Sequence, residues 1–262
     1  TPRQRLRAYA RAWALRLLSL RARRSEPTQD SLQIVYYHHV FDDERDGFRR
    51  QLKWMHERGD FVSLDQAIAW LDDDTPVVGR HFCVTFDDGF ASCATHALRE
   101  LEAFNVPAAF FVATDFVDAS MQGMHERMHR FFDPPKPISF MTWDDCRRLR
   151  DAGMTLGSHT ATHQDLINLD AQEVTYELQR SKERLEAELS IPCQHFCAPR
   201  GQPGLHYHAG RDPELAERAG YRSFLTTIRG HVRPGFTSPY KVERDHLMAN
   251  WPMHQLEYFL GR

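Results

Sequence analysis

The sequence lacks several features that mark specialised classes of protein. It has no apolar run of about 20 residues, the length that crosses a bilayer as a helix, so we expect no transmembrane segment. Its five cysteines are scattered and form no Cys-x-x-Cys pair, so neither a disulfide framework nor a thiolate zinc site is indicated. Dispersed cysteines of this kind are typical of reduced thiols, and we expect a cytoplasmic protein.

The sequence also has no excess of positive charge. Its 33 lysines and arginines are outnumbered by 36 aspartates and glutamates, and the formal net charge is -3. Because nucleic-acid binding needs a basic surface, we expect no nucleic-acid partner. The length of 262 residues suits one barrel-sized α/β domain or two small domains. The 15 histidines are unusual, and they direct attention to metal or acid–base chemistry.

The beginning of the chain is strongly basic. Residues 3–24 contain eight arginines and no acidic residue, and apolar residues recur among them at helical spacing. We expect a cationic amphipathic helix and a polar linker in residues 1–30, followed by the main domain in residues 31–262. Two interpretations of the helix stay open. It contacts the inner face of an anionic membrane peripherally, or it packs its apolar stripe on the domain or on a second subunit.

The main domain alternates between short apolar runs typical of strands and segments with helical periodicity. The strand-like runs are residues 32–37, 81–86, 108–113, 154–157, 195–198 and 223–228. Such alternation predicts an α/β fold with parallel strands, either a doubly wound sheet or a barrel. Residues 115–141 interrupt the pattern, and we interpret them as an inserted loop that is either a lid over a site or a plain surface excursion.

Polar side chains follow four of the predicted strands at the point where each strand ends. They are His38, Asp87 with Asp88, His159 with His163, and Arg200. An isolated Asp-Asp-Gly is most often an ordinary turn, and one histidine at a strand end is most often structural. The carboxyl ends of parallel strands, however, lie at one edge of the sheet, where α/β proteins build their sites. We therefore expect these side chains to lie close together.

The two histidines after the strand at residues 154–157 have the spacing of metal ligands. His159 and His163 are four residues apart and can face one ion. With one carboxylate they make a three-ligand set that leaves positions open for water and substrate, which is the composition of a catalytic zinc site. His-x-x-x-His alone is also common on ordinary surfaces, so the prediction depends on the nearby strand-end aspartates.

Three segments of the sequence resemble the motifs of the polysaccharide deacetylase family, also called the NodB homology or carbohydrate esterase 4 family. Residues 85–89 match the first motif, residues 158–163 match the second, and residues 196–201 are similar to the third. The likeness extends from about Ile34 to Arg244. It implies a deformed (β/α) barrel and the metal-dependent removal of acyl groups, acetyl above all, from N-acylated sugars.

The resemblance also implies a role for most of the strand-end residues. Asp87 would be the general base. Asp88, His159 and His163 would bind a divalent metal ion, for which Zn²⁺ is the first choice. The metal would polarise the amide carbonyl while the base accepts a proton from water. The oxyanion that forms would lie between the metal and a backbone N–H near Arg200.

Two positions depart from the family pattern. Many members have an arginine where this sequence has Cys197, and that arginine holds the catalytic aspartate. Many also have an aromatic residue where this sequence has Arg200. Arg244 resembles a later position of a related branch, and we expect it to supply the missing guanidinium.

The general acid is harder to identify, because no clear copy of the family's late histidine motif is present. A branch of the family opens with Tyr-His and uses that histidine to protonate the leaving amine. By this resemblance we assign the acid role to His38. His231, His246 and His254 are weaker candidates, and each of these histidines is equally compatible with a surface position.

The leading hypothesis is a metal-dependent hydrolase that removes an acetyl group from an N-acylated amino sugar of a bacterial glycan or a lipid-linked glycan precursor. The basic helix expected at residues 3–24 motivates the lipid-linked substrate. Two alternatives stay open: a deacylase of small non-sugar amides, and a glycan-binding module that kept the fold and lost the chemistry. The Asp88, His159 and His163 set argues against the binding module, whereas the altered third motif keeps it open.

Overall fold

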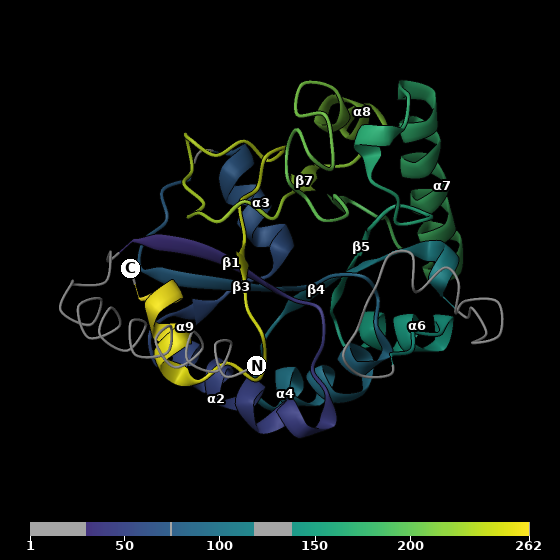
Figure 1. The fold of residues 1–262 in the computed structure, drawn as a ribbon. Coiled ribbons are helices and arrows are strands. Elements are labelled where there is room, and N and C mark those ends of the chain that lie inside the picture. The colour runs from purple at the N-terminus through teal and green to yellow at the C-terminus, as the bar shows by residue number, and fades with distance from the viewer. Residues whose placement is uncertain (1–29, 74, 118–137, 262) are drawn as a thin grey trace, which may run out of the picture.

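The computed structural model describes residues 30–73, 75–117 and 138–261. The predicted basic helix and most of the predicted inserted loop lie outside these ranges. Within them the chain forms an eight-stranded sheet in which all paired strands are parallel (Figure 1). No helix in the described part of the chain has the length and apolar character needed to span a membrane.

The strands follow one another across the sheet in the order β7-β6-β5-β4-β3-β1-β8, and the short β2 pairs with β3 off this path. Their bounds are β1 Ser31–Tyr37, β2 Asp60–Phe61, β3 Arg80–Phe86, β4 Ala108–Val112, β5 Thr155–Ser158, β6 His195–Cys197, β7 Ser223–Leu225 and β8 Asp245–His246. The six predicted strands are therefore all present, and β2 and β8 are additions that the sequence pattern did not predict.

One short segment near the end of the chain spans the open side of the curled sheet. Val242 pairs with Leu225 at the end of β7, and three residues later Asp245 pairs with Val35 in β1. Residues 242–246 therefore contact both edges of the sheet. The predicted deformed (β/α) barrel is confirmed, because a doubly wound sheet would leave these two edges far apart.

Helices cover the outside of the sheet and one end of the barrel. The longer ones are α2 Arg45–His56, α3 Leu64–Asp72, α4 Leu98–Ala103, α6 Trp143–Asp151, α7 Ala171–Leu189, α8 Asp212–Arg218 and α9 Met253–Leu260. Short helical turns are η1 Asp42–Glu44, the π-helical η2 Cys93–Ala97, η3 Thr114–Phe116 and η4 Leu166–Asn168. In Figure 1, α3 lies on the opposite side of β1 and β3 from α2 and α4.

Local sequence signals explain where several helices begin. Ser63 accepts a hydrogen bond from a backbone N–H in the first turn of α3. Thr142 with Asp145, and Asp170 with Glu173, form reciprocal capping boxes at the starts of α6 and α7. A cap of this kind contributes about 1 kcal/mol of helix stability because it satisfies backbone donors that have no partner within the helix.

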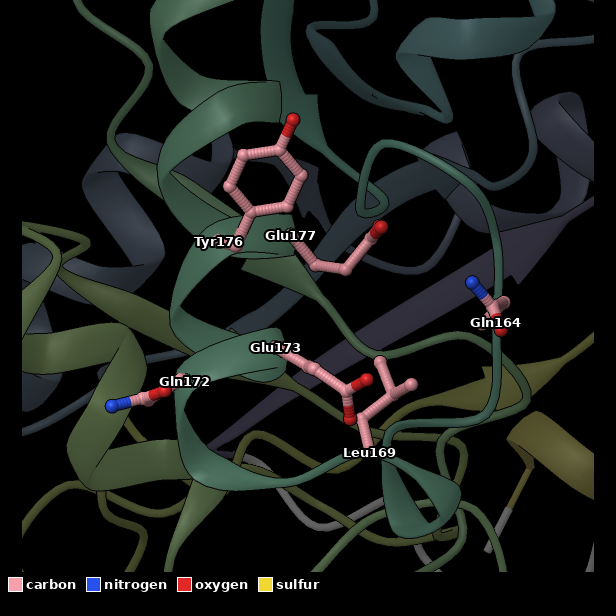
Figure 2. Close-up of a pocket in the computed structure, with 6 residues that line it drawn as sticks. All are labelled: Gln164, Leu169, Gln172, Glu173, Tyr176 and Glu177. Carbon is pink, nitrogen blue, oxygen red and sulfur yellow. The ribbon is translucent and has the colours of Figure 1, made fainter.

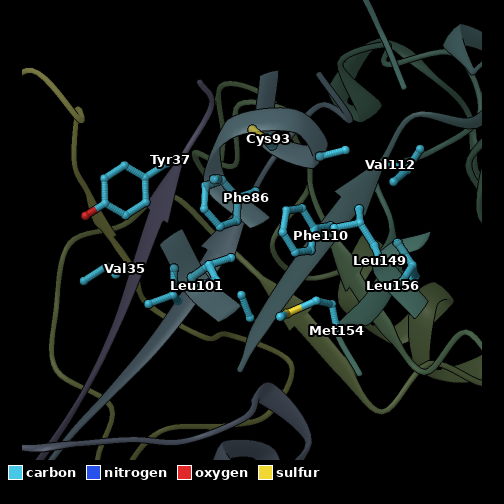
Figure 3. Packing of buried hydrophobic residues seen from close by; sticks show 14 of the residues in the cluster. Val35, Tyr37, Phe86, Cys93, Leu101, Phe110, Val112, Leu149, Met154 and Leu156 are labelled. Atoms are coloured by element: carbon cyan, nitrogen blue, oxygen red, sulfur yellow. The ribbon is translucent and has the colours of Figure 1, made fainter. Parts of the chain in front are cut away.

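The outer face of the sheet packs against the surrounding helices. Strand side chains alternate between the two faces, so Val35, Phe86 and Phe110 share the outer face. Figure 3 shows them in one layer with Leu101 of α4 and Leu149 of α6. This layer packs the strands against the helices and so helps to set where their carboxyl ends lie.

The inner face of the sheet forms a second core, which α3 closes. Ile34, Cys83 and Phe111 point inward and pack in the same cluster as Ile68 of α3. Gly157 makes room for this layer, because a Cβ there would lie only 2.6 Å from the Phe111 ring. The helix α3 covers the amino ends of the strands, and the opposite end of the barrel carries the polar residues predicted at the strand ends.

A polar chain ties α3 to the amino ends of β5, β6 and β7. His195 is fully buried, with Nδ1 2.8 Å from Ser223 Oγ and Nε2 3.1 Å from Asp65 Oδ1. Thr155 donates to the other oxygen of Asp65 at 2.8 Å. The hydrogen bond from His195 outweighs partial burial and lowers the pKa of Asp65 to about 2.

We predict that Asp65→Asn reduces the free energy of unfolding near pH 7. The side chain of Asp65 is 49% exposed, so solvent screening limits the loss to about 1 kcal/mol. The folded pKa lies below the unfolded value of about 3.9, so the contribution is complete above pH 4 and disappears as the pH falls towards 2. Urea unfolding across this pH range measures it, with the exposed Asp60→Asn as control. A difference between Asp65→Asn and wild type that does not change with pH would contradict the prediction.

Candidate active site

The polar residues predicted at the strand ends meet at the carboxyl end of the barrel. β1 and β3 pair residue for residue up to Tyr37 and Phe86, so His38 and Asp87 leave the sheet side by side. The backbone N–H of Asp87 donates to the Tyr37 carbonyl at 3.0 Å, which continues the pairing by one residue. His159 follows β5 in the same way, and its N–H donates to a carbonyl of β4 at 3.0 Å.

Asp87 forms a buried ion pair with Arg244. The two terminal nitrogens of the guanidinium each lie 2.8 Å from one oxygen of the carboxylate, and both side chains are almost completely buried. Burial by itself would raise the pKa of Asp87, but the charge and hydrogen bonds of Arg244 outweigh it and hold that pKa below its usual value. Asp87 is therefore an ionised carboxylate at neutral pH.

The other donors of Arg244 are also satisfied inside the barrel. Nε donates to the Thr226 carbonyl at 2.9 Å, and Nη1 donates to Thr85 Oγ1 at 3.0 Å. Cys197 Sγ lies 2.9 Å from Nη2 and 3.7 Å from both oxygens of Asp87. The structure thus places a guanidinium from residue 244 next to the small side chain that stands in the arginine position of the third motif.

Asp88 contacts a different set of groups from its neighbour Asp87. Its Oδ1 lies 3.2 Å from His159 Nε2 and 3.0 Å from His163 Nε2. The backbone of Asp88 is left-handed, with φ of 73°, and Gly89 follows with φ of 78°. Few residues other than glycine adopt this conformation, and here it forms the turn that directs the second carboxylate to the histidines.

Asp88, His159 and His163 fit a divalent metal. One ligand atom from each lies within 4.8 Å of the others, and all three residues are buried. His159 Nδ1 lies 2.8 Å from the Cys197 carbonyl, so Nδ1 is the donor and Nε2 is left as the ligand atom. Two imidazoles and one carboxylate form the donor set of many catalytic zinc sites, and they leave coordination positions open.

A second trio of donors nearby is a poorer metal site. Asp87, His159 and Cys197 also bring their donor atoms within 4.8 Å of one another. The cationic guanidinium of Arg244, however, already contacts both Asp87 and Cys197. A metal ion there would meet a fixed positive charge at close range, so the site at Asp88 is the one that fits.

The loop that carries the two histidines is held by Glu177 of α7. Its carboxylate accepts hydrogen bonds from the N–H groups of Ala161 and Thr162, at 3.0 Å and 2.9 Å, and from the Thr162 hydroxyl at 3.1 Å. Figure 2 shows Glu177 on α7 with its side chain directed toward the loop that continues to Gln164. Glu177 was not predicted from the sequence; the signal for it is an acidic residue on the buried stripe of an amphipathic helix, next to Val174.

A pocket of about 370 Å³ lies beside this contact. It is lined by Gln164, Leu169, Gln172, Glu173, Tyr176 and Glu177 (Figure 2). None of the predicted site residues lines it. It is connected to the metal donors through Gln164, which follows His163, and through Glu177, which holds the loop of the two histidines.

His38 lies at the exposed edge of the donor cluster, which is formed by Asp88, His159 and His163. Its Nε2 is 4.0 Å from Asp88 Oδ2, and 37% of its side chain is exposed. Its Nδ1 lies 3.2 Å from His246 Nε2. His231 is remote from this edge, because the adjacent Val232 pairs near the opposite end of β1. His254 belongs to α9, on the outside of the sheet (Figure 1).

Arg200 follows β6 with a left-handed backbone, φ of 57°. Its guanidinium lies 2.7 Å from Asp165 Oδ2 at the rim and pairs with that carboxylate, whereas the guanidinium that binds Asp87 comes from Arg244. The Arg200 carbonyl accepts a hydrogen bond from Thr227 at 2.6 Å, which fixes the turn. A contribution of Arg200 to an oxyanion site therefore has to come from its backbone.

Solved structures with the same fold include two bacterial proteins. The deacetylase PplD of Streptococcus pyogenes, in complex with acetate, has a TM-score of 0.70 and 20% identity, covering 90% of this chain and 99% of that one. IcaB of Ammonifex degensii has a TM-score of 0.73 and 22% identity, covering 89% of this chain and 98% of that one. At these identities the comparison establishes the barrel fold alone.

The curated proteins that are similar in sequence include one from Rhizobium and one from Bacillus. The chitooligosaccharide deacetylase of Rhizobium leguminosarum bv. trifolii is 26% identical over 169 residues, covering 60% of this chain and 68% of that protein. The protein YxkH of Bacillus subtilis (strain 168), named as a polysaccharide deacetylase, is 22% identical over 205 residues, covering 76% of this chain. The matched region spans 65% of the length of YxkH.

The family model described as polysaccharide deacetylase matches residues 75–224, which is more than half of the chain. That region includes Asp87, Asp88 and both histidines of the donor cluster, and it ends before Arg244. The resemblance seen in the three motifs is confirmed. The chain belongs to the polysaccharide deacetylase family, whose members are hydrolases that act on N-acetyl amide bonds.

Proposed function

We propose that the protein is a divalent-metal-dependent hydrolase that removes the acetyl group from an N-acetylated amino sugar of a bacterial glycan or a lipid-linked glycan precursor. The observation that carries this proposal is the ionised carboxylate of Asp87 next to a separate three-donor set that fits a metal. Two relatives support the substrate class. The Rhizobium relative is named for chitooligosaccharides, and the Streptococcus deacetylase holds acetate, the second product of such a reaction.

Asp88, His159 and His163 would hold the metal, and we propose Zn²⁺ because of the imidazole-rich donor set. A zinc ion in such a site makes water more acidic and polarises a carbonyl group. The hydrogen bond from His159 to the Cys197 carbonyl and the support of the loop by Glu177 orient the ligands in advance. Preorganised ligands of this kind raise metal affinity, since less conformational entropy is lost on binding.

The other residues handle protons and charge. Asp87 accepts a proton from the attacking water, whose oxygen bonds to the acetyl carbon. His38 donates a proton to the sugar nitrogen as the C–N bond breaks, and the products are acetate and a free amine. The turn at Arg200 offers a backbone N–H to the oxyanion. Arg244 holds Asp87 as a carboxylate, which is the form a base requires.

Asp87 and His163 have different proposed roles, as base and as metal ligand, so substitutions at the two positions should have different effects. Asp87→Asn should lower turnover at least about 100-fold because it removes the base, and it should leave zinc content unchanged. His163→Ala should lose both zinc and turnover. Acetate release from N-acetylglucosamine oligomers and zinc by mass spectrometry measure the two effects, with the exposed Asp144→Asn as control. Full zinc-dependent activity in Asp87→Asn would refute the assignment of the base.

A substrate panel tests the proposed chemistry. Purified wild-type protein with zinc is offered N-acetylglucosamine oligomers of increasing length, and in parallel small acetamides, formamides and cyclic amides. Acetate release from the oligomers supports the proposal. Activity on the small amides alone would overturn the substrate class, and binding of oligomers without any release of acetate would overturn the reaction.

We also propose a peripheral contact of residues 3–24 with the inner face of the membrane, from the eight arginines and the apolar stripe of the sequence. The full chain should sediment with vesicles that contain phosphatidylglycerol, and less so as salt is raised, because salt screens the attraction. Deleting residues 1–24 should abolish this binding, with phosphatidylcholine vesicles as control. Unchanged vesicle binding, or a loss of folding on deletion, would contradict the membrane contact.

A further inference from the structure

His246 and His38 meet edge to face beside the donor cluster. Their rings are 5.0 Å apart between centroids at an angle of 82°, and His246 Nε2 lies 3.2 Å from His38 Nδ1. The two rings therefore share a hydrogen bond. Nδ1 of His38 is engaged by His246, and the opposite nitrogen, Nε2, lies 4.0 Å from Asp88 Oδ2.

Three independent contacts hold His246 in place. It is paired with Tyr36 in the parallel β8–β1 ladder, and the N–H of Leu247 donates to the Tyr36 carbonyl at 2.9 Å. Its ring stacks on the Tyr36 ring, with centroids 4.8 Å apart and an angle of 27°. Arg229 donates to its backbone carbonyl at 3.0 Å. These contacts fix the position of His246 in the wall of the barrel.

His38 has less support of its own. It follows the last residue of β1, and 37% of its side chain is exposed, so its ring would otherwise be able to rotate. Its ring contacts are with His246 and the edge of Tyr36, at 5.0 Å and 5.5 Å. Of these two neighbours, His246 is the one that offers the ring of His38 a hydrogen bond, and that bond engages Nδ1 and not Nε2.

The charge state of His246 suits this arrangement. Burial, together with neighbouring His38 and Arg229, lowers the pKa of His246 to about 4. Arg244 opposes a positive charge on His246, and Asp87 favours one without reversing the shift. At neutral pH His246 is therefore uncharged, and one of its ring nitrogens can accept a hydrogen bond.

We propose that His246 is a positioning residue, whose hydrogen bond to His38 Nδ1 fixes the rotation of that ring and turns Nε2 toward the donor cluster. This inference rests on the proposed function, in which His38 Nε2 delivers a proton to the departing amine. It assigns to His246 a role that depends on its hydrogen bond. A purely structural role would depend instead on its stacking with Tyr36.

The variant His246→Phe separates these two roles, because phenylalanine retains a ring that stacks on Tyr36 and loses the hydrogen bond. We expect kcat to fall roughly 10- to 100-fold with KM nearly unchanged, since misplacement of a proton donor affects the chemical step. His246→Gln, which keeps a polar group at this position, should recover part of kcat. His231→Phe serves as the matched control for loss of a histidine at the other end of the barrel.

A double-mutant cycle makes the test specific. In a His38→Ala background, His246→Phe should cause no further loss of kcat, because the ring that it positions is gone. Wild-type kcat in His246→Phe, or the same fold loss in both backgrounds, would overturn the proposal. Zinc content and thermal unfolding of each variant show whether the donor cluster and the fold are retained.

A spectroscopic measurement keeps this result separate from the proposed function. In metal-free protein with ¹⁵N-labelled histidine, the Nδ1 signal of His38 should shift in His246→Phe and stay near its wild-type position in His231→Phe. Unchanged His38 nitrogen signals in His246→Phe would overturn the proposed contact. If wild-type protein released no acetate, the proposed function would fail, and the nitrogen signals would still decide whether His246 orients His38.

Discussion

The oppositely charged side chains of Asp87 and Arg244 lie inside the barrel away from water, and each is stable there because of the other. Removing an ion from water costs several kcal/mol, and a buried pair offsets that cost only with close contacts and satisfied donors. Arg244 meets both conditions through two 2.8 Å contacts with Asp87 and further bonds to Thr226 and Thr85. Because Arg244 lies in the segment that spans the open side of the sheet, the ion pair also ties the closure of the barrel to the strand end that carries the base.

The same segment connects the two halves of the site. Arg244 contacts Asp87, and two residues later His246 contacts His38. The left-handed turn at Asp88 directs the second carboxylate to the histidine loop, so two adjacent aspartates serve different partners. One carboxylate is held as an ion by a guanidinium, and the other is placed among imidazoles where a metal fits. The two carboxylates have different partners because the backbone at Asp88 is left-handed.

The sequence predicted the parts of this site that depend on local pattern. Strand ends are visible as the points where apolar runs stop, and parallel strands bring those ends together, so Asp87, Asp88 and the two histidines were placed correctly at one end of the barrel. Family resemblance suggested Arg244, but its contact joins residues 157 positions apart and depends on how the chain closes the sheet. The hydrogen bond of His246 to His38 and the support by Glu177 depend likewise on tertiary packing, which no local periodicity reports. The two-residue strands β2 and β8 were missed because a run of two residues is too short to show the alternation of apolar and polar residues that indicates a strand.

The most direct test of the central ion pair is the coupling between its partners in the free energy of unfolding. It is obtained by urea denaturation of wild type, Arg244→Met, Asp87→Asn and the double variant. Arg244→Met alone should cost about 3–5 kcal/mol, because it leaves a buried carboxylate without its partner, and adding Asp87→Asn should restore much of that loss. We expect a coupling of at least about 2 kcal/mol between Arg244 and Asp87. Losses that add within about 0.5 kcal/mol would show that the two residues act independently and would contradict it.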